Sequence, residues 1–210
     1  MSVCGGKVEE LERLNREVRS CRLCRLASTR KLAVPGEGPE HARIMLIGEA
    51  PGYHEDQQGR PFVGAAGQFL ESLLARIGLT RRDVFICNVI KCRPPENRAP
   101  MPDELELCRP YLIRQLGLVK PEVVITLGRY SMELVFKGSS ISKIHGTTRT
   151  IDGVTYIPMF HPAAALHQPR YRSLIEADFD RVPDILQELD RRNASPPPPE
   201  PAPPEQLSFF

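Results

Sequence analysis

The 210-residue sequence lacks the features that direct a protein into or across a membrane. No apolar run approaches the roughly 20 residues that a bilayer-crossing helix needs, and residues 1–7 contain no hydrophobic signal segment. We therefore expect a cytoplasmic protein. Disulfide bonds are rare in that compartment, so the six cysteines are expected to be metal ligands, catalytic groups or core residues.

The sequence also has little net charge and lacks two common nucleotide-binding motifs. The formal net charge is only +2, so a nucleic-acid surface would have to be a local patch. The sequence has neither a G-x-G-x-x-G fingerprint nor a P-loop, which argues against a nucleotide-binding α/β protein. No internal repeat is evident, and the length suits one domain with a sizeable core.

Apolar runs alternate with helical patterns along residues 1–193. The strand candidates are 44–47, 84–90, 123–127 and 155–160, and the second and third are almost unbroken apolar runs, as in strands covered on both faces. The helix candidates are 8–21, 66–74, 105–116, 129–136 and 174–189. Pro183 should break or restart the last of these helices. The alternation predicts an α/β fold with three layers, α/β/α, around a central, mostly parallel sheet of four strands.

The composition changes abruptly after Asn193. Residues 194–204 contain seven prolines, which cannot pack a core, so we expect 194–210 to be a disordered, extended tether. The tether ends in Gln206-Leu207-Ser208-Phe209-Phe210. Apolar side chains at the free end of such a tether are unfavourable unless a partner groove receives them.

The segment from Gly48 to Gly64 joins the first strand to its helix. Its seventeen residues include four glycines and two prolines, which fix an unusual backbone path. A loop at this position lies at the carboxyl edge of a parallel sheet, where α/β proteins bind ligands. It carries carboxylates and an exposed-looking aromatic residue, Phe62. Glycine and proline density alone leaves open a structured loop without chemistry.

Four of the cysteines form two pairs. Cys21 and Cys24 make a C-x-x-C, and fifteen residues separate Cys92 from Cys108. Two pairs brought together by the fold could bind zinc tetrahedrally or a [4Fe–4S] cluster. Spacing favours neither, and reduced cysteines in an apolar core are the alternative. That alternative suits Cys87, which lies inside a strand candidate.

Four sequence blocks accompany this cysteine pattern. They are Gly48-Glu49-Ala50-Pro51-Gly52, Gly59-Arg60-Pro61-Phe62-Val63-Gly64, Asn88-Val89-Ile90-Lys91-Cys92-Arg93-Pro94-Pro95 and His161-Pro162-Ala163-Ala164. With them, the chain from about Cys21 to Leu189 resembles the family 4 uracil-DNA glycosylases, which are iron–sulfur enzymes of base excision repair. The resemblance implies one [4Fe–4S] cluster on Cys21, Cys24, Cys92 and Cys108. It also implies a monofunctional enzyme that flips uracil out of DNA, hydrolyses its N-glycosidic bond and leaves an abasic site.

Base excision requires a stacking ring, a group that reads the base edge and a donor for the departing anion. Phe62 can stack on the flipped ring, unless it belongs to the core. Asn88 ends an apolar strand, and its amide matches the O4 and N3–H edge of uracil but not that of cytosine; a local turn cap is the alternative. His161 follows the last strand, where its ring N–H would stabilise charge on O2.

The group that handles the water is the least defined part of the motif. In family 1 relatives the comparable block is G-Q-D-P, whose Asp activates water, and Ala50 stands at that position here. Glu49 beside it is our candidate for orienting the water; the alternative is a reaction so dissociative that a base matters little. Pro51, Glu55 and Asn97 are expected to complete the substrate site, with Glu55 where a thymine methyl group would clash.

Loops on the same edge are expected to hold the DNA. Leu166 is a candidate wedge for the gap that the flipped base leaves. Arg170 and Arg172, together with Lys91 and Arg93, are candidate phosphate contacts. We expect a monomer that acts on uracil-containing DNA, is associated with the nucleoid and has no membrane partner.

The last five residues resemble the bacterial sliding-clamp-binding peptide, whose pattern is Q-L-S/D-L-F. Phe209 replaces the second leucine of that pattern. The resemblance implies that Gln206, Leu207, Phe209 and Phe210 bind the replication clamp. An inert chain end is the alternative, and the longer archaeal-type spacing fits less well.

Two rival functions stay open on the residues alone. One relative captures uracil-DNA covalently through a His in an inserted K-R-R-I-H loop ahead of the Cys-Arg-Pro block. No such insert follows Asn88, and His145 lies elsewhere, so turnover is favoured. The second rival, a non-enzymatic metal-bound DNA module, would need no convergence of Glu49, Asn88 and His161, and an excision assay separates it from an enzyme.

Overall fold

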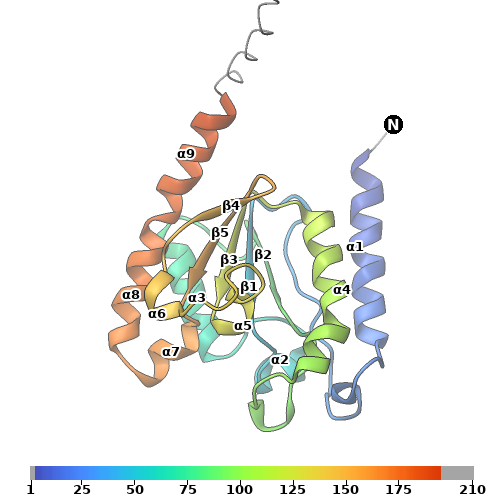
Figure 1. Cartoon of the computed structure of the whole chain (residues 1–210). Helices are drawn as coiled ribbons and strands as arrows, with labels where there is room; N and C mark the ends of the chain where they lie inside the picture. Colours follow the sequence, from blue (N-terminus) through green and yellow to red (C-terminus); the bar gives the residue numbers. More distant parts are fainter. Residues whose placement is uncertain (1–2, 195–210) are drawn as a thin grey trace, which may run out of the picture.

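A computed structural model describes residues 3–194 of the chain (Figure 1). Residues 195–210 lie outside the described residues, and with them the predicted disorder and clamp-binding sequence of the tail. Among the described residues, no helix is both long and apolar enough to cross a membrane.

The centre of the molecule is a sheet of five strands in the order β2-β1-β3-β5-β4 (Figure 1). The strands are β1 (Ile44–Gly48), β2 (Val84–Asn88), β3 (Val123–Leu127), β4 (Arg149–Ile151) and β5 (Val154–Met159). Neighbouring strands are parallel except for β4, which pairs antiparallel with β5. The α/β class and the mostly parallel sheet are therefore confirmed.

The predicted number of four strands is wrong, because β4 adds a fifth. This strand is three residues long and largely exposed, so it has no apolar run to reveal it. Its signal is instead the turn that follows. Asp152 and Gly153 have φ angles of 49° and 80°, the left-handed pair that an Asp-Gly dipeptide supplies to a two-residue hairpin.

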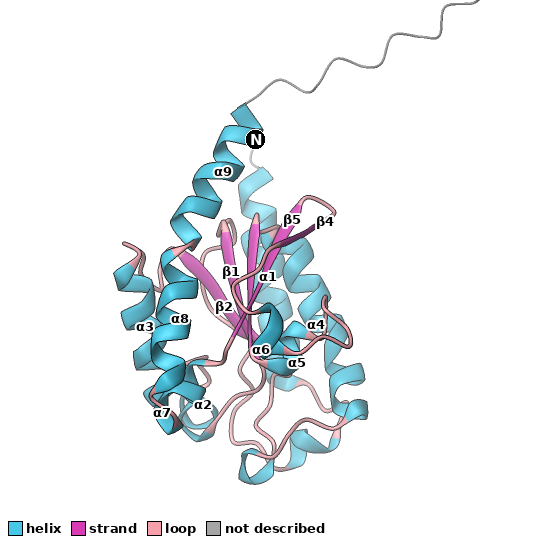
Figure 2. Ribbon diagram, turned by 60° about the vertical axis from the view of Figure 1, so that its left-hand side comes forward, coloured by secondary structure: helices cyan, strands magenta, loops and turns pink. Residues whose placement is uncertain are grey.

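Helices cover both faces of the sheet and complete the three layers (Figure 2). They are α1 (Val3–Ser20), α2 (Tyr53–Gln58), α3 (Ala65–Arg76), α4 (Pro102–Val119), α5 (Arg129–Met132), α6 (Ile141–Ile144), α7 (Pro162–His167), α8 (Arg170–Asp180) and α9 (Val182–Ala194), with short 3-10 turns η1 (Arg25–Ser28) and η2 (Pro95–Asn97). The predicted interruption near Pro183 is confirmed, since α8 and α9 are separate helices that meet at Arg181.

Each face of the sheet has its own apolar core. On one face, Leu70 and Leu73 of α3 and Phe179 of α8 pack against strand residues such as Ile86 and Ile125. On the other, helices α1 and α4 pack against the alternate strand residues, Met45, Phe85, Cys87 and Val124 among them. Burial on both faces explains why the central strands are continuous apolar runs. It also places Cys87 in the core, as its position in a strand indicates.

The segment from Gly48 to Gly64 is more regular than expected, because it contains the helix α2. Glu55 stabilises the start of α2 by accepting a hydrogen bond from the backbone N–H of Gly52 (3.1 Å). Gly59, at φ 69°, ends the helix in the left-handed conformation that glycine favours. The expectation of a loop between strand and helix therefore has to be corrected, since residues 53–58 are helical, and α2 contributes Glu55 to the site described next.

Candidate active site

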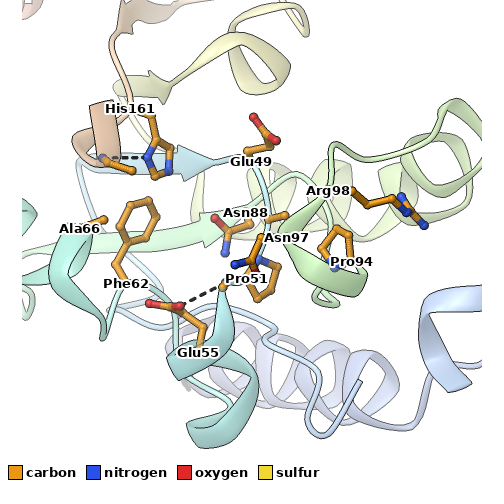
Figure 3. A pocket seen from close by; sticks show the side chains of 13 residues that line it. Glu49, Pro51, Glu55, Phe62, Ala66, Asn88, Pro94, Asn97, Arg98 and His161 are labelled. Carbon is orange, nitrogen blue, oxygen red and sulfur yellow. Dashed lines mark hydrogen bonds between the residues drawn. The ribbon is translucent and has the colours of Figure 1, made fainter. Parts of the chain in front are cut away.

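A pocket of about 390 Å³ opens at the carboxyl ends of β1, β2 and β5 (Figure 3). All eight residues predicted from the sequence to bind substrate line it: Glu49, Ala50, Pro51, Glu55, Phe62, Asn88, Asn97 and His161. The volume lies within the range of small-molecule sites. Segments far apart in the sequence therefore converge on one cavity, as the topology of a parallel sheet requires.

Asn88 lies at the end of β2 with only 1% of its surface exposed. Its Oδ1 atom is buried and accepts no hydrogen bond from the described residues. Burying an amide oxygen without a partner costs roughly 1–3 kcal/mol, so such an atom in a pocket wall points to a ligand donor. Gly48 makes room for this amide, because a Cβ atom there would come within 2.4 Å of Oδ1. The turn-cap alternative finds no support in these contacts.

His161 precedes α7 and accepts a hydrogen bond at Nδ1 from the backbone N–H of Ala163 (3.1 Å). Burial in the pocket wall lowers its pKa to about 4, so the ring is neutral at physiological pH. Since Nδ1 accepts, the proton of the neutral ring is on Nε2. His161 is thus a donor at Nε2 that carries no charge of its own.

Phe62 is both a core residue and a pocket residue. It is 5% exposed, so the expectation of an exposed aromatic is wrong. It belongs to the apolar core on the face of the sheet that α3 covers. Its ring also lines the pocket and stacks with His161, at 5.5 Å between ring centroids and an interplanar angle of 23°. Its backbone has φ 51°, a strained value for a non-glycine residue, and Arg81 donates hydrogen bonds to the carbonyl groups of Pro61 and Phe62. Arg81 therefore holds the ring in place.

The two glutamates of the pocket differ in their contacts. The Oε1 atom of Glu55 accepts from the backbone N–H groups of Val63 (2.8 Å) and Gly64 (3.0 Å), in addition to the bond from Gly52 at Oε2. Glu49 is half-buried, and burial raises its pKa although Arg129 acts in the opposite direction. Glu55 therefore braces the loop, whereas Glu49 is the carboxylate whose proton affinity the site perturbs.

Asn97 lines the pocket from the turn η2 and links two loops at its mouth. Asn97 accepts a hydrogen bond from Arg93 Nε (2.8 Å), and the Arg93 guanidinium lies 5.2 Å from the centroid of the Tyr53 ring. Glu96 and Asn97 both have positive φ angles, 54° and 55°. This bridge joins the segment after β2 to the start of α2. The guanidinium of Arg93 is therefore already in contact with Asn97 and Tyr53.

A scan against family models matches the uracil DNA glycosylase superfamily over residues 35–187. The type-4 uracil-DNA glycosylase of Saccharolobus solfataricus is 47% identical over 85% of this chain and 88% of its own length. The enzymes of the same name from Sulfurisphaera tokodaii and Archaeoglobus fulgidus are 45% and 44% identical, over 85% of this chain in each case and 86% and 94% of their own lengths. The chain belongs to the type-4 uracil-DNA glycosylases.

The candidate DNA contacts differ in whether the structure leaves their side chains able to reach DNA. Leu166 is 46% exposed on α7, as a wedge residue must be. Arg170 is exposed beside Tyr171, and the guanidinium of Arg172 lies 4.4 Å from the centroid of the Phe69 ring. The prediction for Lys91 is wrong: its side chain is 1% exposed and donates to the backbone oxygen of Asn88 (2.7 Å) and to Gln115, so it cannot reach a phosphate.

The four paired cysteines of this type-4 chain gather at one place, which we call the cysteine corner: Cys21, Cys24, Cys92 and Cys108. Cys92 and Cys108 are buried in a small apolar cluster, and Cys24 packs against it. Burial, together with the neighbouring Cys21, raises the pKa of Tyr111 on α4. All four are free thiols. Over residues 3–194, no group of three or more His, Cys, Asp or Glu side chains could hold a metal ion as placed.

Sequence motifs alone missed part of the pocket. Its other lining residues are Gly52, Ala66, Pro94, Arg98 and Ala163. The sequence does carry signals for some of these, because Gly52, Pro94 and Ala163 lie inside the family blocks and Arg98 directly follows Asn97. Nothing in the local pattern marks Ala66 or the supporting Arg81, which reach the site only through the packing of α3 and the loop before β2.

Proposed function

We propose that this chain removes uracil from DNA by hydrolysing the N-glycosidic bond, and that the pocket receives the flipped base. The observation that carries the proposal is the buried, unpartnered Oδ1 of Asn88 beside the neutral donor His161. The chain belongs to the same family as type-4 enzymes that are named for uracil-DNA glycosylase activity. DNA repair by uracil excision is the function of this chain.

Base recognition would rest on Asn88 and Phe62. The Oδ1 atom of Asn88 accepts from N3–H of uracil, and its amide N–H donates to O4. Cytosine presents an acceptor at N3 and a donor at C4, so the same amide would face two mismatched contacts and reject it. The Phe62 ring stacks on the base and contributes about 1–3 kcal/mol, as aromatic residues do for unstacked bases.

Bond cleavage would rest on His161. As the glycosidic bond breaks, the uracil ring takes the bonding electron pair and negative charge develops on O2. The Nε2–H of His161 donates to that oxygen while the ring itself stays neutral, because its pKa of about 4 lies far below neutral pH. A preorganised donor of this kind in a water-excluded pocket is worth about 3–4 kcal/mol.

Glu49 would position the water that attacks C1′ of the sugar. The side chain of Ala50 has no polar atom for this task, and Glu55 is committed to three backbone N–H groups. The raised pKa of Glu49 increases its proton affinity and so its competence to accept the water proton. The product is an abasic site with an intact phosphodiester backbone. Among the described residues, no lysine lines the pocket, and Lys91 is buried and bonded to Gln115, so none is placed to form a Schiff base.

The direct test is an excision assay. Purified protein is incubated with a uracil-containing oligonucleotide and a thymine control, and abasic sites are then cleaved with alkali. Uracil-dependent cleavage that needs alkali is the expected result. An uncleaved uracil strand would contradict the proposal, and a protein–DNA adduct trapped by borohydride during turnover would contradict the monofunctional mechanism.

We further propose that the cysteine corner holds one [4Fe–4S] cluster. Four free cysteines match the ligand number of such a cluster. Donors to sulfur are already in place, since Arg30 donates to Cys92 Sγ (2.8 Å) and the backbone N–H of Lys91 to Cys108 Sγ (3.3 Å). When bound, the cluster would supply cross-links between α4 and the segments that carry the other ligands. The reaction in the pocket needs no electron from it.

The tail, Gln206 to Phe210, is proposed to bind the replication clamp through its apolar end. Binding through this peptide would raise the effective concentration of the enzyme near DNA that the clamp encircles. Deleting residues 206–210 should leave excision on short oligonucleotides unchanged and abolish pull-down of the clamp from the same organism. Equal clamp binding by the truncated protein would refute this role.

A further inference from the structure

A second hollow lies beside the pocket, and all of its charged residues are cations. This basic groove, about 520 Å³ in volume, is formed by the end of α1, the turn η1 with the segment after it, and the end of α2. Its cationic residues are Arg19, Arg22, Arg30, Lys31 and Arg60, and no carboxylate is among the described residues that line it. The groove is therefore the local positive patch that a chain of net charge +2 would need for a polyanion.

Three of these cations have no acidic partner. Within the described part of the chain, Arg19, Arg22 and Lys31 form no salt bridge, although all three are exposed. The Nζ atom of Lys31 donates only to the neutral amide oxygen of Gln57 (2.7 Å). Uncompensated neighbouring cations repel one another, so this arrangement destabilises the free protein slightly and favours an anionic partner.

The other two cations form the rigid part of the groove. Arg30 donates to Cys92 Sγ (2.8 Å) and to the carbonyl oxygen atoms of Arg19 (3.1 Å) and Cys21 (2.6 Å). Arg60 pairs with Glu37, which it shares with Arg81. Arg30 therefore fixes the path of the chain at the groove. Arg19 and Lys31 are exposed cations of the same groove.

The separation of the groove from the pocket indicates how many nucleotides would lie between a phosphate in the groove and a base in the pocket. Helix α2 separates Gly52, which lines the pocket, from Gly59, which lines the groove. Its six residues span about 9 Å at 1.5 Å per residue, which corresponds to two or three nucleotides at about 3.4 Å each along one strand. In Figure 1, α7, α2 and the segment after α1 all lie at the same end of the molecule.

We propose that the basic groove binds phosphates of the DNA strand that carries the uracil, two or three nucleotides from the flipped base. This inference rests on the proposed uracil excision and adds a second anchor to the one expected at α7. With Leu166 and Arg170 on one side of the pocket and the groove on the other, the strand is held on both sides of the extruded nucleotide. Flanking anchors of this kind position the strand without reading its sequence.

The test compares two double variants. Arg19→Gln/Lys31→Gln removes exposed cations from the groove and leaves the residues between the cysteines untouched. Arg82→Gln/Lys120→Gln removes two exposed cations at the opposite, amino-terminal edge of the sheet, just before β2 and β3. Binding to a uracil oligonucleotide is measured across a salt series. The groove variant should lower the slope of log K against log salt by about 1.5–2, and the control should keep the wild-type slope.

Strand truncation supplies the geometric part of the test. Oligonucleotides are shortened to one nucleotide beyond the uracil, either on the 5′ or on the 3′ side. One of the two truncations should erase the difference between wild type and groove variant, and excision at saturating DNA should be unchanged in both variants. A wild-type salt slope in Arg19→Gln/Lys31→Gln would overturn the inference, as would a difference that survives both truncations.

The same measurements keep this inference separate from the proposed activity. If the wild-type protein binds DNA but excises no uracil, the proposed function fails. The salt slope on a uracil-free oligonucleotide then still decides the groove: a lower slope in the groove variant alone supports it, and equal slopes in all three proteins refute it.

Discussion

The pocket and the cysteine corner share one segment of chain, residues 88–108, yet they differ in how complete they are. In the pocket, protein contacts already hold the loop and the histidine: Glu55 and Arg81 fix the loop, and Ala163 fixes the tautomer of His161. In the cysteine corner, burial raises the pKa of Cys92, and that of Cys108 to about 11, which disfavours the thiolate form. Most groups of the pocket are therefore held in place without a ligand, whereas the proposed cluster would supply the links between the cysteines of the corner.

This contrast predicts that pocket variants lose rate and corner variants lose stability. The largest effect on rate is expected for His161→Ala, which should lower the single-turnover excision rate by about 10²–10³-fold because it removes a preorganised donor to the leaving base. The melting temperature should change little. The matched control is His167→Ala at the exposed end of the same helix, which should excise at the wild-type rate. A near-normal rate for His161→Ala would place the anion-stabilising donor elsewhere.

The next effect concerns the corner. Cys108→Ser should reduce the iron content from about four atoms per chain to near none, following the stoichiometry of a [4Fe–4S] cluster, and should lower the melting temperature. Cys87→Ala, a change of a buried cysteine in β2, should keep full iron loading. Iron analysis after anaerobic purification distinguishes the two variants. Zinc in place of iron, or full iron loading of Cys108→Ser, would refute the cluster.

A smaller effect is expected for Glu49→Gln, at roughly tenfold in rate, below the usual 10²–10⁴ of a full proton-transfer catalyst. Its pKa is raised, so in wild type the active carboxylate form should be lost as the pH falls through a value above the ordinary one of about 4.3. His161 stays neutral until about pH 4, so Glu49 is expected to lose its carboxylate form first as the pH falls. The acid limb of the rate profile should disappear in Glu49→Gln. Its persistence in the variant would assign the limb to another group.

The sequence predicted where the site residues lie better than it predicted how exposed their side chains are. Positions at strand ends were predictable, because the carboxyl ends of parallel strands meet at one edge, and Glu49, Asn88 and His161 do line one pocket. The exposure of side chains was not, since it depends on packing between distant segments. Phe62 and Lys91 were both expected at the surface, and both are buried.

The fold shows the same division. Apolar runs revealed the strands that are covered on both faces, but β4 has an exposed, polar surface and is held by its turn and its pairing to β5. Helix α2 was missed because glycine and proline dominate the segment around it, while the residue that stabilises its first turn, Glu55, was read only as a possible pocket residue. Supporting contacts such as Arg81 follow from tertiary packing and carry no local signal.

The central claim is that the Asn88 amide recognises the uracil edge in a pocket that is otherwise complete. The most direct measurement is the single-turnover excision of uracil by Asn88→Ala beside wild type, with circular dichroism and iron content recorded on the same samples. The account predicts a loss of about 10²-fold or more in rate, with the fold and the iron content unchanged. Excision at the wild-type rate by a folded Asn88→Ala protein would contradict it.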